Sequence, residues 1–177
     1  MSKILDVTAR EILDSRGNPT VECEIKIKEG VVRASVPSGV STGLHEAHEL
    51  RDGGKRFHGM GVLNAVNNIK GPIAKVLKGK YIDQRELDKL LINLDGTANK
   101  RKLGANTILA ASLAIARAGA LSKGLPLYKY ISNISKTKLS LPVPALNIIN
   151  GGKHAGNRLS FQEFMIFPTG AKSFSEA

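Results

Sequence analysis

Three polar side chains, His154, Gln162 and Glu163, lie in the otherwise apolar and glycine-rich segment PALNIINGGKHAGNRLSFQEFMIFP, close to the end of the 177-residue sequence. A buried imidazole, amide and carboxylate cost several kcal/mol if they have no partners. A fold keeps such groups only where a hydrogen-bond network, a metal or a ligand satisfies them. We therefore interpret these three residues as candidates for a catalytic or ligand-binding site.

Two short apolar segments surround these polar residues, at 145–149 and 159–167. Prolines and a Gly-Gly turn bound them, which predicts two buried strands joined by a loop. Gln162 and Glu163 are sequence neighbours, and neighbours on a regular strand point to opposite faces. Both side chains can face one site only if the strand ends or bulges there. In the alternative, one faces a site and the other caps a helix or pairs with a lysine.

A second candidate is the loop VPSGVSTG at residues 36–43. Its glycines permit close approach of the backbone to an anion or a metal, and they also permit movement. A solvated connecting loop is the alternative interpretation. The glycine and hydroxyl residues of this loop are Ser38, Gly39, Ser41, Thr42 and Gly43.

The first third of the sequence has the pattern of an antiparallel sheet. From Val21 to Ile27, apolar residues alternate with charged ones, as in a half-buried strand. A turn at Glu29-Gly30 leads into a strand at 31–36, and residues 4–13 supply another. In the intervening DSRGNP turn, Gly17 and Pro19 should stop regular pairing. The prediction is a three-stranded meander.

The middle of the sequence has helical periodicity. A helix is predicted from Gly61, with a break at Gly71-Pro72 where Pro72 starts a new short helix. Asp83 and Glu86 form a capping-box pattern before an apolar face that ends at Asp95-Gly96. Residues 105–122 are apolar on nearly every side, which predicts a helix that is buried all round.

A short helix is then expected from Pro126 through Ile131, followed by a polar linker at 133–140. We place a domain boundary in this linker, with one domain at 1–138 and a second at 139–177. The fold class is α+β for the first domain.

Composition argues against several classes of function. The net charge is +11, but the basic residues are spread along the chain, tryptophan is absent and aromatic residues make up 5%. Platforms for stacking nucleic-acid bases are therefore scarce. No run of eighteen apolar residues predicts a membrane span, and the start does not resemble a signal peptide. The single cysteine, Cys23, fits a core position in a reducing compartment. We expect a soluble, cytoplasmic protein that binds neither nucleic acid nor membranes.

Six ordered motifs closely resemble enolase, the glycolytic lyase also called phosphopyruvate hydratase. The resemblance covers essentially all 177 residues but less than half of an enolase. It implies an enolase N-terminal cap domain followed by the first β-hairpin of an incomplete α/β (TIM-like) barrel. The motifs are DSRGNPTVE, VPSGVSTG, HELRDGG, DGTANKRKLGANTILAASLAIARA, PVPALNIINGGKHAGN and FQEFMIFPTGAK.

The resemblance also implies roles for the candidate residues. The VPSGVSTG loop would be a mobile lid, with Ser41 coordinating the second of two Mg²⁺ ions. His154 would contact the phosphate region of the substrate, and Gln162 and Glu163 would contact substrate and order the acid side of the reaction. The surface that packs against a second subunit in dimeric enolases would contain Arg10, Arg16 and Glu22.

The implied reaction is the reversible dehydration of 2-phosphoglycerate to phosphoenolpyruvate, in glycolysis and gluconeogenesis. Negative charge accumulates on an enediolate, and two magnesium ions stabilise it while a lysine acts as base and a glutamate as acid. The remaining metal carboxylates, the acid, the base and the phosphate-binding arginine match no residue here. We therefore expect the 177-residue chain to be inactive alone. In the whole enzyme it would form a homodimer or larger homo-oligomer.

Two alternatives remain open. The chain is one subunit of a split enolase, whose partner polypeptide supplies the rest of the barrel, or it is a non-catalytic enolase-like binding or dimerisation module. Two strands of an eight-stranded barrel leave backbone groups unpaired. Residues 139–168 should therefore be poorly ordered, self-associated or complemented by another chain.

Overall fold

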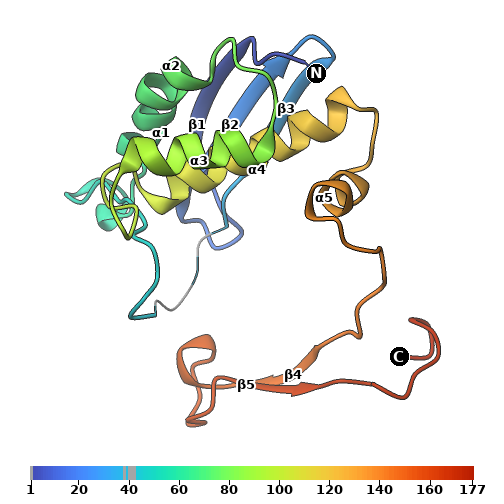
Figure 1. Cartoon of the computed structure of the whole chain (residues 1–177). Coiled ribbons are helices and arrows are strands. Elements are labelled where there is room, and N and C mark those ends of the chain that lie inside the picture. The colour runs from blue at the N-terminus through green and yellow to red at the C-terminus, as the bar shows by residue number, and fades with distance from the viewer. Residues whose placement is uncertain (1, 38, 40–42) are drawn as a thin grey trace. The chain divides into compact units, whose positions relative to one another are not determined.

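A computed structural model describes residues 2–37, 39 and 43–177 of the chain (Figure 1). The chain divides into two compact units. The first unit consists of Met1–Ser38 and Leu44–Thr137, and the second unit consists of Gly39–Gly43 and Lys138–Ala177. Each unit is described by itself.

The first unit contains the three-stranded antiparallel sheet that the sequence predicts. Its strands are β1 (Asp6–Leu13), β2 (Pro19–Ile27) and β3 (Gly30–Ser35), in the order β1-β2-β3. The antiparallel pairing of β1 with β2 and of β2 with β3 confirms the predicted meander. The alternating apolar residues of β2 are buried, as its pattern predicts. The prediction that Pro19 stops pairing is wrong. Pro19 is opposite Leu13 and is the first residue of β2, a position where a missing N–H is tolerated.

The helix that begins after Gly61 does not break at Gly71-Pro72, so that prediction is wrong. Helix α1 (Leu63–Asn68) continues through a π-helical turn (Ile69–Ile73) into α2 (Ala74–Leu77). Pro72 lies inside this wider turn, which accommodates a residue that has no N–H to donate. The apolar stripe therefore stays continuous, and the π-helical turn packs against β1.

Helix α3 (Gln84–Asp95) has the predicted start and stop. The Asp83 side chain accepts a hydrogen bond from the Glu86 N–H at 3.0 Å, and Gly96 ends the helix in the left-handed conformation. In a full capping box the Glu86 side chain would also accept a hydrogen bond from the Asp83 N–H. Here the Asp83 N–H donates to the Tyr81 carbonyl instead.

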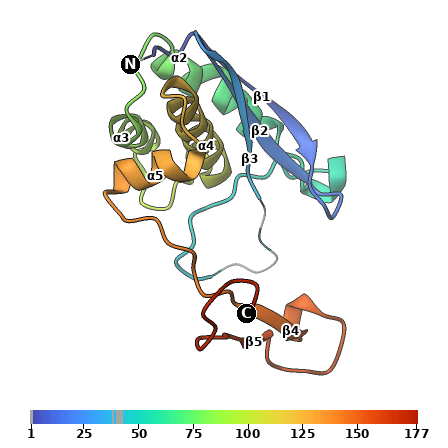
Figure 2. The ribbon, with the colours of Figure 1, turned by 90° about the vertical axis from the view of Figure 1, so that its right-hand side faces the viewer.

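Helix α4 (Ala105–Ser122) packs against β2, β3 and α3, and Figure 2 shows α3 and α4 on the same side of the sheet. The prediction that this helix is buried on all sides is wrong, since Leu109 and Leu113 are exposed. Within the described ranges, α4 is the one helix long and apolar enough to span a membrane, a property shared by core helices of soluble proteins. Its packing against two strands is that of a core helix.

Helix α5 (Leu127–Ser135) packs against α4 and ends at Ser135, four residues beyond its predicted end, with the following Lys136 in the left-handed conformation. The Ser135 hydroxyl donates to the Ile131 carbonyl within the helix, and the Ser132 hydroxyl donates to the Thr137 carbonyl just beyond it, so the helix ends inside the predicted linker. A short 3-10 turn (Arg56–Gly59) precedes α1. The largest fully buried side chains of the first unit include Ile4, Ile25, Ile27, Ile69, Ile73, Leu77, Leu91 and Ile115.

The second unit contains the predicted hairpin, formed by the antiparallel strands β4 (Leu146–Asn150) and β5 (Glu163–Ile166) (Figure 1). A 3-10 turn, Gly152–His154, follows β4. The prediction of buried strands is wrong for this chain, because every residue of both strands is exposed. A two-stranded sheet has no further strand or helix to cover its apolar side chains.

Candidate functional site

The loop that joins β4 to β5 closes on itself through its backbone. The Gly151 N–H donates to the Gln162 carbonyl at 3.0 Å, and the Gly152 N–H donates to the Leu159 carbonyl at 2.8 Å. Gly151 is the one buried residue of Lys138–Ala177. A Cβ at Gly151 would lie 2.3 Å from the Phe161 carbonyl oxygen, so only glycine permits this approach.

This closed loop brings two of the predicted site residues together. His154 Nδ1 lies 3.2 Å from Glu163 Oε1, with 25% of the histidine side chain and 32% of the glutamate side chain exposed. β5 begins at Glu163, so Gln162 lies just outside the strand and the strict alternation of faces does not apply to the pair. Glu163 has His154 as its partner rather than a lysine, and Gln162 is positioned by its backbone carbonyl.

Asparagine residues that the sequence analysis did not identify support this loop. Asn157 Nδ2 donates to the Asn150 carbonyl at 2.9 Å, and the Leu159 N–H donates to Asn157 Oδ1 at 3.0 Å. Asn147 Nδ2 donates to Asn150 Oδ1 at 2.6 Å, next to the irregular register of β4. Asparagine at a strand end and inside a glycine-rich loop is the available signal, since this side chain readily bonds nearby backbone.

The VPSGVSTG loop is described only in part. Ser38, Ser41 and Thr42 lie outside the described residues. The loop starts from a firmly held strand end, where the Val36 N–H donates to the Val21 carbonyl and buried Thr20 Oγ1 donates to the Val36 carbonyl at 2.5 Å. Gly39 and Gly43 belong to the described part of the second unit.

The HELRDGG segment that follows is held by side chains distant in sequence. The Asn106 amide accepts from the Leu50 N–H at 3.1 Å and donates to the Leu50 carbonyl at 3.0 Å, which imitates one rung of a β-ladder. Asp52 accepts from the N–H groups of Leu63 and Asn64 at 2.8 Å each and so caps α1. These contacts fix the segment after the loop onto the first unit.

Glu11 joins the same region to the sheet. Its carboxylate accepts hydrogen bonds from the Arg56 guanidinium and, at 2.8 Å, from the Val62 N–H. The hydrogen bonds from Arg56 hold the pKa of the Glu11 carboxyl below its ordinary value, with a further contribution from Val62. The ion pair is therefore structural and stabilises the charged form of Glu11.

The predicted dimer surface forms ion pairs within the chain. Arg10 Nε lies 3.0 Å from Glu22, and Arg10 Nη2 and Arg33 Nε each lie 2.6 Å from Glu24. Hydrogen bonding from Arg33, with the charge of Arg10, lowers the pKa of the Glu24 carboxyl. Arg16 lies 3.7 Å from Asp14 in the β1–β2 turn. Arg10, Arg16 and Glu22 thus occupy exposed or half-buried positions on the sheet and its turn.

The described residues do not fit a metal centre. No group of three or more His, Cys, Asp or Glu side chains able to hold a metal ion occurs in residues 2–37, 39 and 43–177. Cys23 is fully buried in the sheet, and burial raises the pKa of its thiol to about 12. The prediction that Cys23 is a core residue is confirmed.

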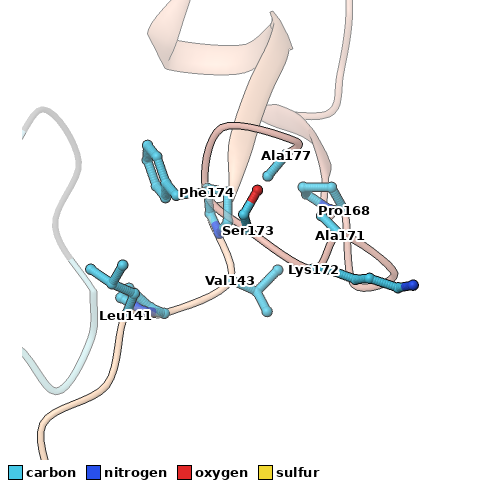
Figure 3. A pocket seen from close by; sticks show the side chains of 10 residues that line it. Leu141, Val143, Pro168, Ala171, Lys172, Ser173, Phe174 and Ala177 are labelled. Carbon is cyan, nitrogen blue, oxygen red and sulfur yellow. The ribbon is translucent and has the colours of Figure 1, made fainter.

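An open pocket of about 200 Å³ occurs in the second unit between residues 141–144 and the C-terminal turns (Figure 3). Its lining residues include the apolar side chains of Leu141, Val143 and Phe174 together with Lys172 and Ser173. His154, Gln162 and Glu163 do not line it. The candidate site is therefore the hairpin loop and not this pocket.

Comparisons with known proteins identify both parts of the chain. Residues 4–131 match the family model "Enolase, N-terminal domain", and residues 138–177 match "Enolase, C-terminal TIM barrel domain". The chain is 58% identical over 177 residues to Enolase B of Dictyostelium discoideum, covering 98% of the chain and 40% of that protein. It is 60% identical over 176 residues to an enolase of Pyrococcus furiosus, covering 99% of the chain and 40% of that protein. The chain therefore spans about 40% of the length of these relatives.

Proposed function

This chain belongs to the enolase family, and we propose that it contributes the N-terminal part of a phosphopyruvate hydratase, which reversibly dehydrates 2-phosphoglycerate to phosphoenolpyruvate in glycolysis and gluconeogenesis. The observation that carries the proposal is the match of two enolase family models, in chain order, across 4–131 and 138–177. Near-complete coverage of the chain at about 59% identity supports it.

The proposed division of labour follows the two units. Residues 1–138 would form the cap domain, and residues 139–177 would open the catalytic barrel. The exposed apolar side chains of β4 and β5 support this assignment, because the first hairpin of a closed barrel must pack against further strands and helices. The whole enzyme would be a cytoplasmic homodimer or larger homo-oligomer, with Arg10, Arg16 and Glu22 at the subunit contact.

The hairpin loop would hold the substrate side of the site. Dehydration removes a weakly acidic proton next to a carboxylate, and negative charge accumulates before hydroxide leaves. With Nδ1 of His154 lying 3.2 Å from Glu163 Oε1, the other ring nitrogen would carry the Nε2–H that contacts the phosphate region of the substrate. Gln162 and Glu163 would contact the substrate and order the acid side of the reaction. The loop at 36–43 would be the lid that excludes water.

We propose Mg²⁺ as the metal of the complete enzyme, with Ser41 as the contribution of this chain. Hard cations such as Mg²⁺ favour oxygen ligands, which suits a serine hydroxyl. The described residues contain no metal-holding group, so the other ligands would come from sequence outside this chain, as would the base and the acid.

Reconstitution tests the proposal. The purified 177-residue chain is mixed with the part of the Pyrococcus furiosus enolase that lies beyond the matched 40%, and phosphoenolpyruvate is followed by its ultraviolet absorbance in the presence of Mg²⁺. We expect no activity from either piece and activity from the assembled mixture. A chain carrying His154→Ala should assemble equally well and lose most of this activity.

Two results would contradict parts of the proposal. Activity at enolase-like rates from the 177-residue chain alone would contradict the expectation that the base and the other metal ligands match no residue of this chain. An assembled but inactive mixture would refute the catalytic role. Exposure of both faces of the hairpin favours a split enolase as the second candidate over a non-catalytic module. Native mass spectrometry separates them, because two co-purifying chains indicate a split enzyme and a lone short chain indicates a binding module.

A further inference from the structure

The Asn157 side chain connects the two arms of the loop between β4 and β5. Its Nδ2 donates at 2.9 Å to the carbonyl of Asn150, the last residue of β4, and its Oδ1 accepts at 3.0 Å from the N–H of Leu159, on the return arm. Both ends of one amide are therefore used within the loop. An amide that satisfies a donor and an acceptor at once is fixed in orientation as well as in position.

The residue that Asn157 holds lies opposite Glu163. Asn150 and Glu163 are partners in the register of the hairpin, at the end where the loop begins. His154 lies on the arm between Asn150 and Asn157, and its N–H donates to the Gly151 carbonyl at 3.1 Å. The arm that carries His154 is thus held at one end by the hairpin and at the other by Asn157.

We propose that Asn157 is a positioning residue, which closes the loop so that His154 Nδ1 is held against Glu163. Every contact in this arrangement lies within residues 138–177, so the second unit supplies it without the rest of a barrel. An Nε2–H of His154 is then the donor that remains for an anionic oxygen of the ligand, which requires the ring to carry protons on both nitrogens when the ligand is bound. The assignment of that ligand as the substrate phosphate rests on the proposed function, whereas the positioning itself does not.

Nitrogen-15 NMR of the ring nitrogens in the 177-residue chain tests this inference. Spectra are recorded near pH 8, above the ordinary titration range of imidazole, where the two neutral tautomers have distinct shifts. His154 of the parent chain should show the tautomer that carries its proton on Nδ1. The variant Asn157→Ala should lose this signature, and exchange of the Leu159 amide proton should accelerate about tenfold, the effect of losing one hydrogen bond.

Asn133→Ala is the matched control, because Asn133 is an exposed asparagine of α5 outside the loop. It should leave the His154 signature and the Leu159 amide unchanged. Amide signals of the first unit should match the parent in Asn157→Ala, and in Asn133→Ala they should change only around the substituted position in α5, which separates a local change from unfolding.

The inference is wrong if Asn157→Ala keeps the parent tautomer of His154, or if the parent chain shows no preference for the Nδ1–H form. Failure of the proposed function has a different outcome. An assembled, inactive enzyme whose His154 signature still depends on Asn157 would refute the function and retain the positioning role.

Discussion

Most apolar strand residues are buried in the first unit of this protein, whereas those of the second unit are exposed. In the first unit, β2 lies between two neighbouring strands under α4, and Val21, Cys23 and Ile25 have no exposed surface. In the second unit, β4 has one neighbouring strand, and Ile148 remains 60% exposed. Apolar residues on a strand are therefore buried only when other elements of the same unit can reach them.

The first unit closes its core with elements that follow one another closely along the chain. The β-meander provides the sheet, α1, the π-helical turn and α2 pack on β1, α4 packs on β2 and β3, and α3 and α5 pack on α4. The second unit has a well-formed loop without a core, because its contacts are hydrogen bonds near the chain reversal. The first unit is thus stabilised by a hydrophobic core, whereas the second unit is ordered by local hydrogen bonds.

Separating the units tests this comparison most strongly. A chain of residues 1–137 should unfold cooperatively on heating, because its buried residues are all its own. Residues 138–177 should show no cooperative transition, since an isolated two-stranded hairpin is at best marginally stable in water. Thermal scans by circular dichroism measure both. A cooperative transition in the shorter piece would mean that the comparison is wrong.

Substitution of isoleucine by alanine in each unit should give unequal effects. Ile115 is fully buried in α4, and Ile115→Ala should lower the free energy of unfolding by about 2–5 kcal/mol. Ile148→Ala, at an exposed position of β4, should change it by less than about 0.5 kcal/mol. Urea denaturation of the 177-residue chain provides the measurement, and equal losses would contradict the assignment of the core to the first unit.

Gly119→Ala tests the contact between α4 and α5. A Cβ at Gly119 would lie 2.4 Å from Cζ of the buried Tyr130 ring, so the variant should lose about 1–3 kcal/mol in the free energy of unfolding. In a Tyr130→Ala background the same substitution should be neutral or stabilising by up to about 1 kcal/mol, because alanine favours helix over glycine. A loss that persists in that background would exclude the ring as its cause.

Acidification should weaken the first unit partly through Glu11. Because hydrogen bonds from Arg56 lower the pKa of folded Glu11, the unfolded chain binds the proton at higher pH than the folded chain. The stability gained from Glu11 is complete above about pH 5 and is lost as pH falls through the lowered pKa, below 4.5. Glu11→Gln should therefore cost about 1 kcal/mol at pH 7 and flatten the decline in stability at acid pH.

The control for this experiment is Glu86→Gln, at an exposed glutamate whose backbone N–H, and not its carboxylate, joins the helix cap. Its unfolding free energy should follow the parent across the pH range. A pH profile of Glu11→Gln that coincides with the parent would show that the ion pair with Arg56 contributes nothing measurable.

Several elements could be predicted because their signals are local. The alternation in β2, the Asp83 cap and the left-handed Gly96 each involve residues within a few positions of one another. The hairpin of β4 and β5 follows from two apolar runs bounded by prolines and glycines. The pairing of His154 with Glu163 could be anticipated only as a requirement for partners, because the loop that joins them has no regular period.

Other features depend on residues far apart in the sequence. The amide of Asn106 holds Leu50, and Asp52 caps α1 from the preceding loop. Neither contact has a sequence pattern that separates it from an ordinary solvated side chain. The π-helical turn around Pro72 likewise depends on the continuous apolar stripe that packs against β1, which outweighs the usual tendency of proline to end a helix.

The sequence by itself determined which segments are strands and helices, where most of them begin, and the enolase resemblance, because these depend on neighbouring residue types and motif order. Only the tertiary structure decided that Leu109 and Ile148 face solvent, that Asn157 closes the hairpin loop, and that Glu163 meets His154. Burial and hydrogen-bond partners depend on which elements come to face one another, and no local pattern specifies that arrangement.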